Sequence, residues 1–306
     1  MSGIAFCFPG QGSIEAGMGR EIAEASPAAL EVFRRGSAAS GLDLERLCFE
    51  ADAEELVDTA VQQPALVATS LAFLAALKEK LGIKPDFVVG HSVGEFAALA
   101  ASDAISDDDA IALVRERGIA MAEAARQKPG SMAAILGLED EVVEQLCRKI
   151  LGVWPANYNC PGQIVVSGEH LAVDECIELA QEAGARRTVK LKVSGAFHSP
   201  LVARAAERLR PAVERVNFRE PVAPFVSTVT ARIESAQRVA PLLVDQLTAP
   251  VRFTQAAREL MKQGAHTFVE VGPGNVLSGL VKRIDRTAKA ISVNSLAALE
   301  KLPDSL

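Results

Sequence analysis

The sequence predicts an α/β protein whose core is a mostly parallel sheet, with a second, smaller unit inserted into the chain. Short apolar runs bounded by turn residues alternate with helical patterns towards both ends of the sequence, which is the order that produces parallel sheets. The middle of the chain instead follows the order strand, helix, strand, strand, helix, strand. The 306 residues, 49% of them hydrophobic, are enough to bury a sizeable core.

The core elements are predicted from apolar runs and from the turn residues around them. They are strands at 4–8, 86–90 and 267–271, and helices at 21–35, 62–81, 93–101 and 107–125. Three aspartates begin the last of these helices, where the helix dipole favours negative charge. A loop at 9–13 follows the first strand, and a Gly-Pro-Gly turn with another helix follows the strand at 267–271.

The inserted unit begins after Lys128-Pro129-Gly130. Its predicted elements are strands at 132–136, 153–158, 163–167 and 187–193, and helices at 139–150 and 171–183. The order β-α-β-β-α-β is that of the ferredoxin-like unit. We therefore divide the chain into an α/β core, residues 1–125 and 196–306, and a ferredoxin-like subdomain, residues 126–195.

Composition and charge exclude several classes of function. A net charge of −7 and 5% aromatic residues argue against nucleic acid as a partner. The five cysteines are widely spaced and no His/Cys cluster has the spacing of metal ligands, so we expect reduced thiols and no metal. No apolar run of about 18 residues and no secretion signal are evident. We expect a soluble cytoplasmic protein without a membrane segment.

Gly90-His91-Ser92-Val93-Gly94 matches the G-x-S-x-G pattern of a nucleophile elbow. It follows an apolar strand and opens a helix, where a strained turn lifts the serine hydroxyl clear of the sheet. The backbone N–H of Val93 and the helix N-terminus can stabilise a developing oxyanion. The alternative is an ordinary strand-to-helix turn in which the two glycines occur by chance.

A nucleophilic serine needs a base, and His198 is the best placed of the four histidines. It ends a loop between a predicted strand and a helix starting at Ser199-Pro200, a position suited to general base catalysis. We expect the side chain of His91 to point away from the nucleophile, and His170 and His266 to be surface or core residues. A purely structural role for His198 is the alternative.

Arg117 borders the apolar stripe of the helix at 107–125, whereas Arg115 lies well off it. A guanidinium on a side that faces the core needs an anion. An internal Asp or Glu would satisfy it. The carboxylate of a substrate, held by two parallel hydrogen bonds, would satisfy it equally well.

Together these residues resemble the malonyl-CoA:acyl carrier protein transacylases, which include the acyltransferase domains of fatty acid and polyketide synthases. The resemblance extends over nearly the whole chain. It rests on these segments in order: Phe8-Pro9-Gly10-Gln11-Gly12-Ser13, Gly90-His91-Ser92-Val93-Gly94-Glu95, Arg117-Gly118 with Met121, Asn159-Cys160-Pro161-Gly162-Gln163, Phe197-His198-Ser199, Pro250-Val251-Arg252 and Val271-Gly272-Pro273-Gly274. Each segment is modest alone, and the complete set is specific.

The resemblance implies a hydrolase-like α/β core with a ferredoxin-like subdomain, and a site in the cleft between them. It implies a Ser92–His198 dyad in which the main-chain carbonyl of Gln246 orients the histidine. Further implied roles are an oxyanion hole from the N–H groups of Gln11 and Val93, and substrate binding by Arg117, Met121, Asn159 and Phe197.

The implied reaction moves a malonyl group from coenzyme A to the phosphopantetheine thiol of acyl carrier protein, in fatty acid biosynthesis, without metal or cofactor. The sequence shows no strong interface signal, so we expect a monomer. Phe197 and Val93 resemble the malonyl-selective pattern, although Ile14 and Val93 depart from the residues most common in the family. The alternatives are a trans-acting acyltransferase of a polyketide pathway, a serine thioesterase and a catalytically silent binding module. Lys190 and Lys192, on one face of a predicted strand, are a candidate contact for the carrier.

Overall fold

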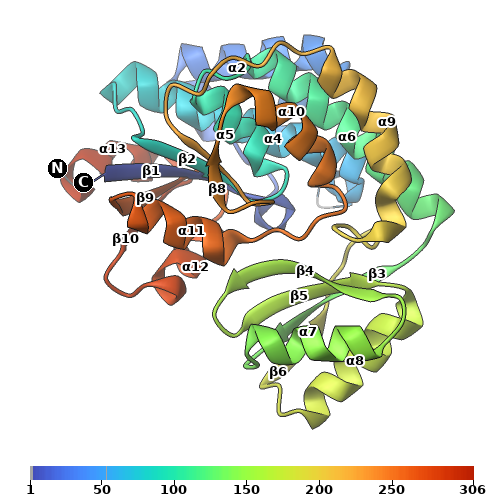
Figure 1. Cartoon of the computed structure of the whole chain (residues 1–306). Helices are drawn as coiled ribbons and strands as arrows, with labels where there is room; N and C mark the ends of the chain where they lie inside the picture. Colours follow the sequence, from blue (N-terminus) through green and yellow to red (C-terminus); the bar gives the residue numbers. More distant parts are fainter. Residues whose placement is uncertain (1–2, 53) are drawn as a thin grey trace.

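The computed structural model describes residues 3–52 and 54–306 and contains two sheets (Figure 1). The larger sheet has the strand order β10-β9-β1-β2-β7-β8, and every neighbouring pair is parallel except β7 with β8. Its strands are β1 (Gly3–Phe8), β2 (Phe87–Gly90), β7 (Phe225–Ser227), β8 (Arg232–Glu234), β9 (Ala265–Val271) and β10 (Lys289–Val293). The predicted α/β class with a mostly parallel sheet is confirmed.

Helices cover both faces of this sheet because its strands present apolar side chains on both sides. In β1, Phe6 and Phe8 pack into one core and Ala5 and Cys7 into the other. The first face carries α1 (Arg20–Ala25), α2 (Pro27–Ser40), α3 (Leu44–Phe49), α4 (Thr59–Leu81), α5 (Gly94–Ala101), α6 (Asp107–Gln127), α9 (Ala203–Glu214) and α10 (Ala236–Asp245). The second face carries α11 (Phe253–Lys262) and α12 (Val276–Ile284). Two short helices, α13 (Leu296–Glu300) and α14 (Leu302–Ser305), end the chain.

The smaller sheet has the order β4-β5-β3-β6 with all neighbours antiparallel. Its elements are β3 (Ser131–Leu136), α7 (Asp140–Lys149), β4 (Val153–Cys160), β5 (Gln163–Gly168), α8 (His170–Glu182) and β6 (Arg187–Lys190). The predicted β-α-β-β-α-β order is therefore present. Strand β6 ends at Lys190, three residues before the predicted end, because the chain turns after Leu191, whose N–H makes the last ladder bond with the Met132 carbonyl.

The predicted helix at 21–35 is broken in the structure. Ser26 separates α1 from α2, and its Oγ accepts a hydrogen bond from the Ala29 N–H at 3.1 Å. Pro27 occupies the first position of α2. A proline disfavours helical backbone at the residue before it, and serine is a strong N-cap. The break therefore follows from Ser26 and Pro27, and both signals were present in the sequence.

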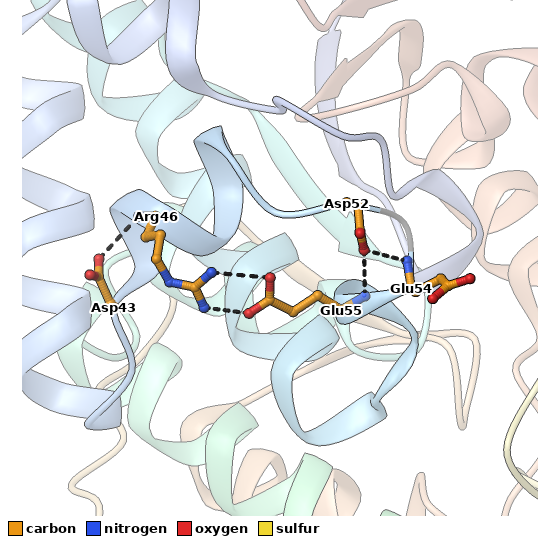
Figure 2. A network of polar contacts seen from close by, with 5 residues as sticks. All are labelled: Asp43, Arg46, Asp52, Glu54 and Glu55. Carbon is orange, nitrogen blue, oxygen red and sulfur yellow. Dashed lines mark hydrogen bonds and ion pairs between the residues drawn. The ribbon is translucent and has the colours of Figure 1, made fainter.

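A cluster of charged residues fixes the chain before α4. Arg46 on α3 forms two parallel contacts with the carboxylate of Glu55, while Asp52 accepts hydrogen bonds from the N–H groups of Glu54 and Glu55 (Figure 2). The start of α4 itself is set by Asp58, its N-cap, whose Oδ1 accepts a hydrogen bond from the Ala60 N–H at 2.9 Å. The sequence expectation of no apolar run of about 18 residues is wrong for α4, which is long and apolar enough to cross a membrane. However, 83% of its most apolar window is buried within the fold, as in the core helix of a globular domain.

A backbone contact joins the smaller sheet to the segment of the core between α10 and α11. Asn157 of β4 forms an isolated parallel bridge with Val251, supported by two hydrogen bonds of 2.8 Å, Tyr158 N–H to the Val251 carbonyl and Val251 N–H to the Ala156 carbonyl. The smaller sheet thereby lies beside the carboxyl ends of β1 and β2 (Figure 1). In parallel α/β sheets this end of the strands is where ligands bind.

Candidate active site

Ser92 lies at a sharp turn between β2 and α5. Its φ of 53° is in the left-handed region that non-glycine residues rarely adopt. The turn needs its two glycines for steric reasons. A Cβ on Gly90 would lie 2.1 Å from the Glu95 nitrogen, and one on Gly94 would lie 2.2 Å from the Phe8 carbonyl oxygen. The predicted elbow is present in the structure, with both glycines required by packing.

His198 lies next to the serine hydroxyl. Ser92 Oγ and His198 Nε2 are 2.8 Å apart. His198 Nδ1 is 2.9 Å from the Gln246 carbonyl oxygen and 3.1 Å from that of Ala249. Carbonyl oxygens only accept hydrogen bonds, so Nδ1 carries the proton and the Nε2 lone pair faces the serine. This is the tautomer that can accept the hydroxyl proton.

The imidazole of His198 is held in its neutral form. Burial, together with the nearby charge of Arg117, lowers its pKa to about 3 despite the opposing effect of the two carbonyl groups. At neutral pH the ring is therefore available as a base. The backbone of His198 also has a positive φ of 57°, so both members of the dyad occupy unusual conformations that the surrounding structure enforces.

Arg117 projects from α6 into the same site and is completely buried. Its Nη1 donates to Gln63 Oε1 at 2.6 Å, and its Nη2 donates to Gln246 Oε1 at 3.0 Å and to Ser92 Oγ at 3.1 Å. Burial lowers its pKa to about 10, and the charge of Glu95 opposes that change. Within residues 3–52 and 54–306, no carboxylate forms an ion pair with Arg117. The internal acid considered from the sequence is thus replaced by two neutral amides.

Two backbone N–H groups near the serine are without a protein acceptor among the described residues. In the described part of the chain, the N–H groups of Gln11 and Val93 donate to no protein acceptor. Val93 is the N-cap of α5, so the helix dipole adds to its effect. The side chain of Gln11 is fixed by hydrogen bonds to Thr59 Oγ1 (2.8 Å) and Gln62 Oε1 (2.6 Å) on α4. The geometry is compatible with an oxyanion hole.

A cavity of about 190 Å³ opens onto Ser92 and His198 between the two sheets. Its walls come from the loop after β1, from the elbow, from β3, β4 and β5, and from α12. Asn159 and Phe197, both predicted as substrate-binding residues, line it. Met121 does not; it is buried behind Arg117, where its Sδ lies 3.3 Å from Gln63 Nε2.

His91 departs from the expectation that its side chain points away from the site. The ring lines the cavity, and its Nε2 lies 2.9 Å from Asn159 Oδ1. Burial lowers its pKa, so the ring is neutral. The other two histidines lie elsewhere: His170 begins α8, and His266 is an exposed residue of β9.

Residues 5–301 match the acyl transferase domain family. The chain belongs to this family. It is 45% identical over 305 residues to the malonyl CoA-acyl carrier protein transacylase of Bacillus subtilis, covering 98% of this chain and 96% of that protein. The same activity is named for a relative in Staphylococcus aureus, 39% identical over 301 residues and 97% of each chain.

Solved structures of such transferases have the same fold. A malonyl transferase from Streptococcus pneumoniae superimposes with a TM-score of 0.94 at 42% identity, covering 99% of this chain and 100% of that one. A malonyl-transacylase in complex with a type II polyketide acyl carrier protein gives a TM-score of 0.96 at 38% identity over the full length of both chains.

Two residues of this acyltransferase site were not predicted from the sequence. Gln63 and Glu95 are fully buried beside the arginine. Gln63 lies one turn into α4 and holds Arg117. Glu95 immediately follows the elbow and ends the segment Gly90–Glu95, which carries part of the family resemblance; the signal in the sequence was an acid at the start of an apolar helix. Because each contacts residues far away in the sequence, neither role could be inferred from spacing.

Proposed function

We propose that this protein transfers a malonyl group from coenzyme A to the phosphopantetheine thiol of acyl carrier protein, through a malonyl ester on Ser92. The observation that carries the proposal is that the hydroxyl oxygen of Ser92 contacts both a base, His198, and a buried cation, Arg117. Ser92 Oγ lies 2.8 Å from His198 Nε2 and 3.1 Å from Arg117 Nη2. One methylene separates the carboxylate of a malonyl group from the carbonyl carbon that Oγ would attack, so that carboxylate must fall close to the guanidinium.

In the first half-reaction, His198 Nε2 takes the proton of Ser92 as Oγ bonds to the thioester carbonyl carbon. The N–H groups of Gln11 and Val93 stabilise the resulting oxyanion. The carbonyl re-forms, the carbon–sulfur bond breaks, and the proton on His198 passes to the departing thiolate. The products are coenzyme A and malonyl-Ser92.

In the second half-reaction, the thiol of the carrier's phosphopantetheine arm gives its proton to His198 Nε2 and its sulfur attacks the ester. The oxyanion is held as before. Collapse breaks the bond to Oγ, and His198 returns the proton to Ser92. Each half-reaction uses the Ser92 hydroxyl, the His198 imidazole and the two backbone N–H groups that hold the oxyanion, and no metal or cofactor takes part.

Arg117 selects the acyl group by its charge. A malonyl carboxylate pairs with the buried guanidinium, whereas an acetyl group leaves that charge without an anionic partner, which is costly for a completely buried group. Methylmalonyl keeps the carboxylate, and the cavity wall at Phe197 distinguishes its extra methyl only by packing. An apolar pocket is worth about 1–3 kcal/mol for one such group.

The setting of the reaction is part of the proposal. The acceptor is the carrier protein of fatty acid biosynthesis, and the protein works as a cytoplasmic monomer with no membrane or nucleic-acid partner. Residues 126–195 act as a subdomain that closes the cavity over residues 1–125 and 196–306. The lining of the cavity by β3, β4 and β5 supports this division.

The test is transfer to a purified carrier protein, followed by its intact mass. Wild-type enzyme with malonyl-CoA should add one malonyl group to the phosphopantetheine form of the carrier and none to the form without it. Ser92→Ala should abolish transfer. Ser102→Ala, which removes a buried hydroxyl at the far end of α5 that donates to the Leu99 carbonyl, should not. Release of free malonate without carrier modification would instead identify a thioesterase.

A further inference from the structure

Glu95 is the only acidic side chain in α5, and it is completely buried next to the elbow. Its Oε1 accepts hydrogen bonds from the backbone N–H and, at 2.8 Å, from the hydroxyl of Thr228. Its Oε2 accepts a short hydrogen bond from Gln246 Nε2. The carboxyl group therefore uses one oxygen to hold the chain after β7 and the other to hold a side chain of the site.

The amide of Gln246 connects this carboxyl group to Arg117. Gln246 Nε2 donates to Glu95 Oε2 and, at 3.1 Å, to the Ser92 carbonyl oxygen. Its Oε1 accepts from Arg117 Nη2 at 3.0 Å. The Ser92 carbonyl oxygen can only accept and the Arg117 guanidinium can only donate. Burial raises the pKa of Glu95 to about 7, so the carboxylate form that accepts from this amide is present at neutral pH and above. The amide thus has a single satisfactory orientation, with its oxygen facing the guanidinium.

Glu95 acts on Arg117 through its charge, which opposes the lowering of the Arg117 pKa by burial, without contacting the guanidinium. A carboxylate in direct contact with the guanidinium would compete with the carboxylate of a substrate for the same N–H groups. Glu95 instead acts through a neutral amide, and Arg117 Nε has no hydrogen-bond partner among the described residues. The guanidinium therefore keeps an unused N–H group, and its hydrogen bond to Ser92 Oγ places it beside the nucleophile.

We propose that Glu95 is a positioning residue that fixes the amide of Gln246, and through it the guanidinium of Arg117, and so sets the preference for acyl donors with a free carboxylate. The inference rests on the proposed function. It assigns Glu95 no contact with the substrate.

The decisive variant is Glu95→Gln. If its oxygen stays on Thr228, its NH₂ group faces the NH₂ group of Gln246, so the Gln246 amide must rotate and direct its own NH₂ towards Arg117. The ratio of kcat/KM for acylation by malonyl-CoA to that by acetyl-CoA should fall about 10- to 100-fold, as expected when a hydrogen bond to a charged group is lost. Acylation by acetyl-CoA should change little, because His198 is held by the Gln246 carbonyl, not by its side chain.

Thr228→Val is the matched control, since it removes another hydrogen bond to Glu95 without affecting the amide. It should lower the free energy of unfolding and leave the donor preference unchanged. Gln246→Met removes the connecting amide and keeps the main-chain carbonyl. It should reduce the preference as Glu95→Gln does, and the double variant should lose no more than either single variant.

The outcomes separate this inference from the proposed function. A wild type that forms no malonyl ester overturns both. A wild type that prefers malonyl-CoA, with Glu95→Gln folded and equally selective, overturns only the positioning role. If Glu95→Gln does not fold, Gln246→Met takes its place in the test. An unchanged preference for malonyl-CoA over acetyl-CoA in Gln246→Met would then overturn the positioning role of Glu95. Equal losses with both donors in Glu95→Gln would identify a merely structural residue.

Discussion

Replacing Arg117 by methionine should reverse the donor preference of the enzyme and leave its nucleophile working. Methionine has a similar length and fits a completely buried site, so the change removes the charge and three hydrogen bonds, to Gln63, Ser92 and Gln246. The Ser92–His198 contact does not involve Arg117. The loss should therefore fall on substrates that bring a carboxylate.

The size of the effect follows from burial. Leaving one partner of a buried ion pair without its counterpart costs about 3–5 kcal/mol, and each 1.36 kcal/mol corresponds to about a tenfold change in rate. We expect kcat/KM for malonyl-CoA to fall about 10²- to 10⁴-fold. For acetyl-CoA it should stay equal or rise, because a neutral acyl group no longer faces an unpaired guanidinium.

The assay is rapid-mixing acylation with each donor, read by intact mass, with Arg115→Met as the control. Arg115 is on the same helix, is only partly buried, and donates to the Ala60 carbonyl at 2.7 Å. The Arg115→Met variant should keep the wild-type preference for malonyl-CoA over acetyl-CoA. A malonyl rate within about threefold of wild type in Arg117→Met, far below what a buried pair is worth, or equal losses with both donors, would refute the reasoning.

Two further predictions concern stability. Gly94→Ala would place a Cβ 2.2 Å from the Phe8 carbonyl oxygen and should lower the free energy of unfolding by about 1–3 kcal/mol or more. Gly279→Ala, in an open position on α12, should raise the free energy of unfolding by about 0.5–1 kcal/mol. Equal effects of the two substitutions in denaturant titrations would contradict this prediction. Because the pKa of His198 is lowered to about 3, the unfolded chain binds a proton that the folded chain does not between about pH 6.5 and pH 3. The free energy of unfolding should therefore fall as the pH falls through that range, and His198→Asn should make the decline shallower. The same pH dependence in wild type and His198→Asn would show that the pKa of His198 is not lowered in the folded protein.

The fold was predictable where the signal is local. The parallel core follows from the alternation of apolar runs and helices, and the inserted unit from six consecutive elements. The misses have physical causes. Strands β7 and β8 have three residues each, too few for periodicity to be detected, and the exposed faces of β10 weaken its apolar pattern.

The site was predictable where its functional residues lie close together in the sequence or require one another chemically. Ser92 stands within a five-residue motif with a steric logic, and His198 was found because a nucleophile needs a base. The side-chain contacts of Gln246 were not predictable, because they join residues 129 and 151 positions apart. His91 was misplaced for a related reason: its direction is set by Asn159, which belongs to the other sheet.

The central claim is that malonyl is carried on Ser92, and the most direct test is the intact mass of the enzyme after brief mixing with malonyl-CoA in the absence of carrier. The account predicts that wild type gains the mass of one malonyl group, that peptide mapping places it on Ser92, and that Ser92→Ala gains none. A wild type that takes up no acyl group, a preference for acetyl-CoA, or an adduct that persists in Ser92→Ala would contradict it.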